Sequence, residues 1–185
     1  MGIRLFLFMP FLKFHLSKPA VMTTDERNLL IDSYGQANSI LLEALEEFPK
    51  KMWQWKPAPD KWSVHEIIVH IADSEVNSYV RCRRFIAEPG SGVYGYDENK
   101  WAAKLNYHQQ STEDALELFK LLRKMTYDLI KNLDEHTWQT ATVDHSDNGI
   151  MQFDDWLSIY EEHIPVHIRQ MKRNLEAWKA VAHKH

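Results

Sequence analysis

Apolar residues recur at helical spacing in four long stretches of the chain, whereas sustained strand-type alternation does not occur. The first stretch follows Thr23-Thr-Asp-Glu26, a capping box in which Glu26 reaches back to the backbone of Thr23. Its stripe comprises Leu30, Tyr34, Ala37, Leu41, Leu45 and Phe48. We therefore predict a first helix from Thr23 to near Pro49, with this stripe in the core.

The second and third stretches begin with similar capping signals. Ser63-Val-His-Glu66 predicts a helix from Ser63 to about Glu88, and Ser111 opens the next helix. The inward stripe expected for the second helix is Val64, Ile67, Ile71, Ser74 and Ser78. The core stripe expected for the third helix is Ala115, Leu118, Phe119, Leu122, Met125, Leu129 and Leu133.

The fourth helix is predicted from about Phe153 to Ala182. Pro165 lies inside it, and an interior proline removes one helical hydrogen bond, so we expect a local distortion there. The inward stripe of this helix comprises Trp156, Tyr160, His163, Ile164, His167, Met171, Leu175 and Trp178.

The connections between these helices differ in character. Residues 52–62 are rich in tryptophan and proline, and we expect them to fold back over one end of the helices. Residues 89–111 form a long link, with a short helix expected near 98–105, and a link of this length often lines a functional pocket. After a short turn at 134–138, residues 140–151 contain Asp147-Asn-Gly149, which leaves a hairpin and an irregular loop both open. The overall prediction is an all-α fold, a four-helix bundle with one long crossover connection.

Composition narrows the classes of function. The 185 residues are 44% hydrophobic and 26% charged, which suits one globular domain, and the net charge of -4 argues against a general nucleic-acid binder. Cys82 is the one cysteine, which excludes an internal disulfide and any zinc site that needs two cysteine ligands. A lone cysteine fits a reducing compartment, and we expect a cytoplasmic protein.

Residues 1–21 are apolar and weakly basic. A signal peptide is one interpretation, but Pro10, Lys13 and His15 interrupt the apolar run, and its unbroken part is too short to span a membrane. We interpret residues 1–21 as an extension outside the domain, which then covers residues 22–185, and we expect no membrane association.

Histidines carry the candidate chemistry of the chain. His163 and His167 are four residues apart, so they lie on the same face of the fourth helix. His70 lies next to the inward stripe of the second helix, and these three imidazoles would suit zinc, nickel, copper or iron(II). Three protein ligands leave positions open for water or substrate, as in catalytic metal sites. The metal would then lower the pKa of a bound water or thiol to give a nucleophile near neutral pH.

Other charged residues near the histidines allow two interpretations. Asp73, one turn after His70, would orient a ligand or a water, or it makes an ordinary hydrogen bond on the surface or between helices. The cluster around Arg81 would attract an anionic ligand or form a solvated face. His65 is expected to be solvated in the first turn of its helix. The acids near the candidate site are Glu66, Asp73, Glu75, Glu161 and Glu162.

Three motifs together are similar to a known family. They are Trp55-x-Pro, Lys61-Trp-Ser-Val-x-Glu66-Ile-Ile-Val-His70-Ile-Ala-Asp73-Ser-Glu75 and Trp156-Leu-x-Ile-Tyr160-x-x-His163-x-x-x-His167-Ile-x-Gln170. Over about residues 22–178 the chain resembles the DinB-like superfamily, and within it the YfiT-type group of metal-dependent hydrolases, which includes bacillithiol transferases. The resemblance implies a four-helix bundle, commonly dimeric, with zinc or nickel held by His70, His163 and His167.

Three hypotheses of function follow. The first is a metal-dependent enzyme, a thiol S-transferase or hydrolase acting on small molecules, with a low-molecular-weight thiol as one substrate. The second is a bundle that binds a metal or ligand without catalysis, as a stress-response module. The third is a plain helical dimer in which the histidines are buried hydrogen-bonding residues, the default for histidines in a core.

Overall fold

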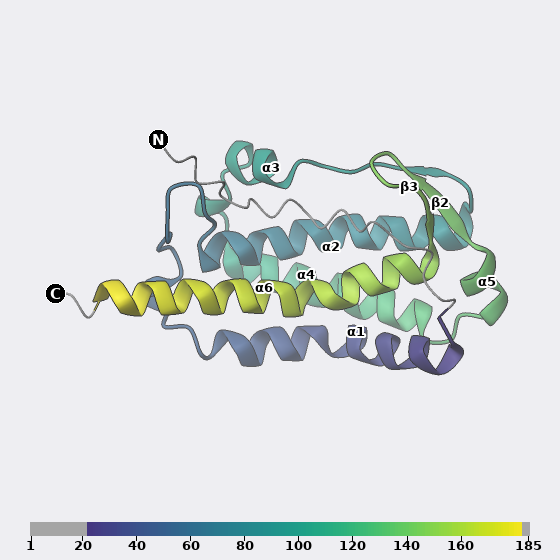
Figure 1. Cartoon of the computed structure of the whole chain (residues 1–185), viewed down its shortest axis with the longest axis horizontal. Coiled ribbons are helices and arrows are strands. Elements are labelled where there is room, and N and C mark those ends of the chain that lie inside the picture. The colour runs from purple at the N-terminus through teal and green to yellow at the C-terminus, as the bar shows by residue number, and fades with distance from the viewer. Residues whose placement is uncertain (1–21, 183–185) are drawn as a thin grey trace, which may run out of the picture.

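Four long helices run along the molecule in the computed structural model, which describes residues 22–182 (Figure 1). They are α1 (Thr24–Leu45), α2 (Val64–Ala87), α4 (Thr112–Ile130) and α6 (Phe153–Ala182). The capping residues predicted from the sequence are confirmed, because Thr23, Ser63 and Ser111 each cap the helix that follows them. The fold is the predicted four-helix bundle.

The helices do not follow a simple up-and-down order. The neighbours of α1 in the bundle are α4 and α6, and these same two helices are the neighbours of α2. Arg27 early in α1 pairs with Asp154 early in α6, so α1 and α6 run in the same direction. Trp156 early in α6 bonds the carbonyl of Ser78 late in α2, so these two helices are antiparallel. Val69 and Ala115, early in α2 and α4 respectively, line the same surface hollow, so α2 and α4 run parallel and a long crossover joins them.

The crossover between α2 and α4 has its own structure. It contains strand β1 (Gly92–Val93), helix α3 (Glu98–Lys104) and the 3-10 helix η2 (Tyr107–Gln109). β1 pairs in parallel with β2 (Thr142–His145), and β2 pairs antiparallel with β3 (Gly149–Gln152). Residues 140–151 therefore form a hairpin, the alternative that the sequence left open, and α5 (Glu135–Thr140) precedes it. In Figure 1 this small sheet lies at one end of the bundle.

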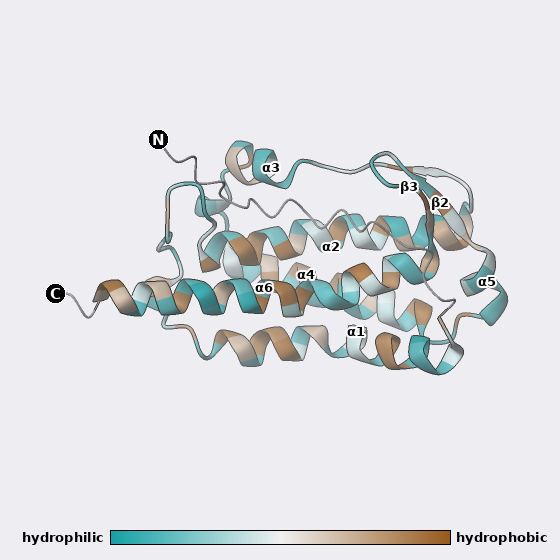
Figure 2. Ribbon diagram, in the orientation of Figure 1, coloured by the Kyte–Doolittle hydropathy of each residue, from teal (hydrophilic) through white to brown (hydrophobic). Residues whose placement is uncertain are grey.

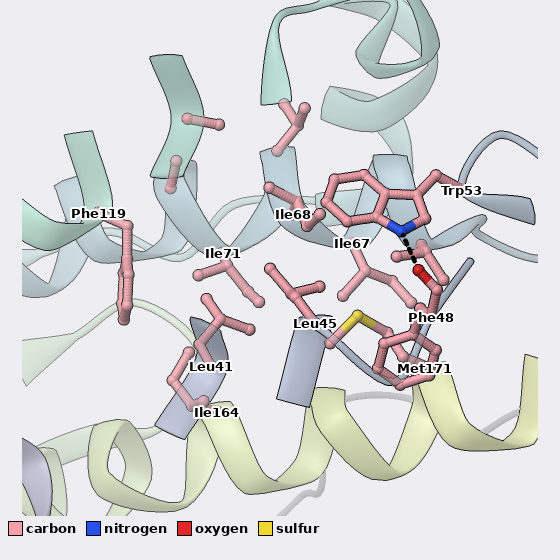
Figure 3. Packing of buried hydrophobic residues seen from close by; sticks show 14 of the residues in the cluster. Leu41, Leu45, Phe48, Trp53, Ile67, Ile68, Ile71, Phe119, Ile164 and Met171 are labelled. Carbon is pink, nitrogen blue, oxygen red and sulfur yellow. Dashed lines mark hydrogen bonds between the residues drawn. The ribbon is translucent and has the colours of Figure 1, made fainter. Parts of the chain in front are cut away.

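The tryptophan-rich connection after α1 folds back over the other end of the bundle, as expected. It includes the 3-10 helix η1 (Lys50–Met52). The Trp53 indole donates a hydrogen bond of 3.0 Å to the carbonyl of Phe48, and Figure 3 shows both residues packed with Leu45 and Met171. This packing places residues 52–62 beside the first turn of α2. Every residue of the inward stripe predicted for α2 is buried. Figure 2 shows the alternation of hydrophilic and hydrophobic residues expected along amphipathic helices.

The stripe predicted for α4 is wrong in part. Ala115 and Phe119 are buried, but Leu118, Met125 and Leu129 are exposed. The buried positions of α4 are instead Thr112, Ala115, Phe119, Arg123, Thr126 and Ile130. The helix is rotated from the predicted orientation because Arg123 pairs inside the core with Glu75 of α2, 2.6 Å away. An apolar pattern alone does not place an arginine in a core.

Gly35 and Pro165 are residues of low helix propensity that lie inside α1 and α6. The ideal Cβ of an alanine at Gly35 would lie 2.7 Å from the Tyr127 ring, which explains a glycine inside α1 despite its cost in helix propensity. α6 continues through Pro165 without interruption from Phe153 to Ala182.

Among residues 22–182, no helix combines the length and the apolar character needed to cross a membrane.

Candidate metal centre

The structure brings His70, His163 and His167 together between α2 and α6. One ring nitrogen from each lies within 4.8 Å of the others, and all three residues are buried. The ring centroid of His70 lies 5.4 Å from that of His163 and 4.8 Å from that of His167. The Nε2 atoms of His163 and His167 are 3.1 Å apart. Among the described residues this is the one cluster of potential ligand side chains compact enough to hold a metal ion. We call it the histidine triad.

The triad fits a transition-metal ion because one ring nitrogen of each imidazole faces the other two rings. Both ring nitrogens of His70 and the Nδ1 of His163 are buried and make no hydrogen bond among the described residues. A buried polar atom without a partner is costly, and a cation bound by one nitrogen of each imidazole would give His70 a partner. Imidazole ligands without thiolates or carboxylates suit zinc, nickel, copper or iron(II), and the donor set does not distinguish among them.

Two neighbours orient the triad. The Nδ1–H of His167 donates to the side-chain oxygen of Gln170, 2.9 Å away, and this tautomer leaves Nε2 of His167 facing the other imidazoles. The Trp62 ring lies 4.7 Å from the His70 ring, and Asn174 holds the Trp62 carbonyl with a hydrogen bond of 2.9 Å. The residues between α1 and α2 thereby cover one side of the triad. Gln170, three residues after His167, could have been found from its helical spacing.

Comparison with known proteins places the chain in a family. Residues 34–171 match the DinB superfamily. The chain belongs to the DinB superfamily. A protein of Halalkalibacterium halodurans is 29% identical over 116 residues, which are 63% of this chain and 67% of that protein. One of Oceanobacillus iheyensis is 31% identical over 107 residues, 58% of this chain and 61% of that protein. Both bear the name "Putative metal-dependent hydrolase".

A solved structure has the same fold. YfiT from Bacillus subtilis, described as "a probable metal-dependent hydrolase with an unusual four-helix bundle topology", aligns with a TM-score of 0.74 and 21% sequence identity. The alignment covers 86% of this chain and 93% of YfiT. The fold of this chain thus has a counterpart in YfiT, and the four-helix bundle is the fold that the sequence resemblance implied.

The imidazoles of this DinB-superfamily chain are held neutral. Burial lowers the pKa of all three histidines, that of His167 to about 4. The neighbouring imidazoles lower the pKa values of His70 and His163 further. Neutral imidazole is the form that binds a metal ion, so the folded protein keeps its candidate ligands deprotonated at neutral pH.

The metal-free protein is expected to lose stability as the pH falls from about 6.5 toward 4. Histidine in the unfolded chain titrates near pH 6.5. Because the folded pKa of His167 is about 4, the unfolded state binds more protons within this window, and the free energy of unfolding falls as the pH falls. For this residue alone the loss is on the order of 3 kcal/mol. Urea denaturation at pH 7 and pH 4.5 measures it. His167→Leu cannot titrate and should show a smaller pH dependence; an identical dependence would contradict the prediction.

A buried ion pair lies behind the triad in the bundle core. The Arg123 guanidinium donates to Glu75 and also to the backbone carbonyl of Tyr160, 3.1 Å away, one turn before His163. The Tyr34 hydroxyl donates to the other oxygen of Glu75 at 2.8 Å. This network connects α1, α2 and α4 to the turn of α6 that carries the first of its two histidines. The sequence analysis missed the role of Arg123.

The acids named from the sequence bind other groups instead of joining the triad. Asp73 accepts a hydrogen bond from the Tyr107 hydroxyl, which is the simpler of its two interpretations. Glu66 completes the cap of α2 and pairs with Lys56. Glu75 accepts hydrogen bonds from Arg123 and Tyr34. Glu161 accepts one from Ser33, and Glu162 accepts one from Arg169.

The prediction of a solvated His65 is wrong. His65 is only 8% exposed, and its backbone N–H donates a hydrogen bond of 2.8 Å to the carbonyl of Trp53. The tryptophan-rich connection covers this turn of α2, and the sequence did not indicate which side of the helix it would cover. The His65 ring lies 5.9 Å from that of His108, outside the triad. His145 is buried at the end of β2.

Proposed function

We propose that the chain binds one divalent metal ion through His70, His163 and His167 and acts as a metal-dependent enzyme on small molecules. The observation that carries the proposal is the triad itself, three buried imidazoles that each bring one ring nitrogen within 4.8 Å of the others, with both nitrogens of His70 making no hydrogen bond among the described residues. The names of the relatives support metal dependence and hydrolysis. When bound, zinc or nickel would supply a Lewis acid that lowers the pKa of a water or thiol near neutral pH.

The chain's own residues would prepare the site in three ways. Gln170 holds the His167 tautomer, and Trp62 covers His70 and excludes water from that side. Tyr160 packs against the His163 ring with a centroid distance of 6.2 Å and directs its hydroxyl to Arg81. The cluster found among the described residues consists of three histidines and contains no carboxylate. A thiol or water bound there would therefore release its proton to the solvent or to a substrate group.

The reaction we propose is hydrolysis or the transfer of a low-molecular-weight thiol onto an electrophile. Purified protein loaded with zinc or nickel is tested for turnover with a panel of ester and amide substrates and, separately, with thiol and electrophile pairs. Turnover that needs the metal supports the proposal. Stoichiometric metal without turnover in either panel would favour the alternative of a non-catalytic metal-binding bundle. The buried, unpaired Cys82 is compatible with action in the cytoplasm.

We also propose that the chain forms a homodimer through the outer face of α2 and α4. Leu118 and Leu121 of α4 line a surface hollow, and a second hollow joins Leu118 to Ala72 of α2. Val76 follows the buried Ala72 by one turn and is exposed, so α2 also presents an apolar side chain on this side of the molecule. Contiguous apolar surface of this kind is typical of interaction sites. The exposed apolar residues of this face are Val76, Val80, Leu118, Leu121, Met125 and Leu129.

Light scattering is expected to give the mass of a dimer for the wild-type protein and of a monomer for Leu121→Glu. Leu121 is 55% exposed within this face, and a buried charge at the centre of an interface is costly. Leu29→Glu is the matched control, because Leu29 is 70% exposed on α1, a helix outside the proposed interface. A monomeric wild-type protein would contradict the dimer.

A further inference from the structure

A polar stripe on α2 leads away from the histidine triad. His70, Ser74, Ser78 and Arg81 follow one another at intervals of four, four and three residues, so they lie on one side of the helix. The two serines are buried and Arg81 is partly buried. Tyr160 of α6 faces the far part of this stripe, and sites for ligands in helical bundles are built between such facing helices.

Arg81 lies at the end of the stripe remote from the triad. Its guanidinium donates to the Tyr160 hydroxyl at 2.8 Å and to the carbonyl of Tyr94 at 2.6 Å. Because the Tyr160 ring packs against His163, the guanidinium is separated from the triad by about the length of one tyrosine side chain. A guanidinium has five N–H donors, and those two bonds leave further donors for a ligand.

A polar atom between the triad and Arg81 lacks a partner. The Ser78 Oγ is buried and makes no hydrogen bond among the described residues. Tyr96 of the crossover lies beside the stripe: burial raises the pKa of its phenol, and a hydrogen bond with the Ser74 hydroxyl partly opposes that rise. Serine side chains at positions 74 and 78 fill less volume than leucine or phenylalanine would. Buried polar atoms without partners indicate a place for a polar ligand or water.

We propose that this stripe is a substrate subsite in which Arg81 holds the carboxylate of a small molecule whose reactive group lies at the triad. The inference rests on the proposed metal site. The eleven residues from His70 to Arg81 correspond to about 16 Å of helix rise. Helical side chains lean toward the N-terminus of their helix, which brings the guanidinium back toward the triad. A ligand with a chain of about six carbons between its two ends therefore suits the subsite.

Glu98 of α3 is the carboxyl group that competes with such a ligand. Burial raises its pKa to about 7, Asp97 adds to the rise, and Arg81 opposes it. Near neutral pH this carboxyl group is protonated in about half of the molecules. Its ionised form would compete for Arg81, so Glu98→Gln should strengthen the binding of a carboxylate. This opposite effect of a neighbouring residue distinguishes a binding subsite from a general loss of structure.

The test compares two thiols that differ at one end. Cobalt-loaded protein is titrated with 6-mercaptohexanoate and with 6-mercaptohexanol, and the thiolate-to-cobalt absorption gives the Kd of each. We expect the carboxylate to bind about 10-fold more tightly, because a charge-assisted hydrogen bond to arginine exceeds a neutral one. Arg81→Gln should abolish the difference without weakening the alcohol, and Arg81→Lys, which keeps the charge, should retain part of it.

Arg83→Gln is the matched control. This neighbouring arginine of α2 contacts the ring and carbonyl of Tyr79 instead of Tyr160, and its loss should leave the ratio of the two Kd values unchanged. Equal Kd values in the wild-type protein, or a ratio preserved in Arg81→Gln, would overturn the subsite.

A third result separates the subsite from the proposed reaction. If cobalt binds but neither thiol gives the absorption band, thiol chemistry at the triad fails, and calorimetry with hexanoate then tests the subsite alone. Saturable binding of hexanoate that disappears in Arg81→Gln supports the subsite, and the absence of saturable binding overturns it.

Discussion

Replacing His163 with alanine is expected to lower the metal content of the purified protein from about one ion per chain to nearly none. His163 contributes one of the three imidazoles of the triad, with its Nε2 3.1 Å from that of His167 and its ring 5.4 Å from that of His70. Two imidazoles rarely hold a metal ion against buffer and chelators. Elemental analysis of tag-free protein after exposure to zinc or nickel measures the loss, and any metal-dependent turnover should vanish with the metal.

His65→Ala is the matched control for this experiment. His65 is a second buried histidine of α2, and its Nε2 likewise lacks a hydrogen-bond partner, but it lies outside the triad. Its replacement removes the same group at similar burial and should leave the metal content unchanged. Full metal content in His163→Ala, or equal loss in both variants, would show that the triad is not the metal site.

Replacing Arg123 with methionine is expected to lower the free energy of unfolding by about 3–5 kcal/mol. The change leaves the Glu75 carboxylate fully buried with only the Tyr34 hydroxyl as a partner. A buried charge that has lost its counter-ion costs far more than the net value of the pair. Urea denaturation of the metal-free protein at pH 7 measures this difference.

The double variant Glu75→Gln/Arg123→Met should recover most of the loss. Glutamine removes the uncompensated charge and still offers Tyr34 an oxygen acceptor. Lys124→Ala serves as the surface control, because the Lys124–Asp128 pair is exposed and its loss should hardly move the denaturation midpoint. A single variant as stable as the wild type, or a double variant no better than the single one, would contradict this account of the ion pair.

Local signals in the sequence predicted the helices well, and they marked the three histidines that the structure brings together. Each capping serine or threonine satisfies backbone N–H groups within three residues, so it marks a helix start without reference to the rest of the fold. Helical spacing likewise placed His163 and His167 together on one face. Bringing His70 to them needed α2 and α6 to be neighbours, and the bundle pattern allowed that arrangement without requiring it.

The errors arose where distant contacts decide the outcome. No role for Arg123 could be predicted because its partner Glu75 lies forty-eight positions earlier, and the buried face of α4 includes this arginine in place of part of the predicted apolar stripe. His65 looked solvated because nothing local shows that the Trp53 backbone binds its turn. The subsite around Arg81 combines residues from α2, α6 and the crossover. Such contacts follow from the packing of whole helices, which hydropathy patterns determine only in outline.

The position of the triad gives a bound metal a second consequence. His70 and His163 belong to different halves of the chain, and the crossover, α4 and the hairpin all lie between them. An ion held by both would act as a reversible cross-link that closes this long loop, and closing a long loop removes much of the entropy of the unfolded chain. Separating α2 from α6 would then require release of the ion, whereas the hairpin and α3 could open with the cross-link intact. A bound metal would thus restrain the packing of α2 against α6 while leaving α3 and the hairpin free to move.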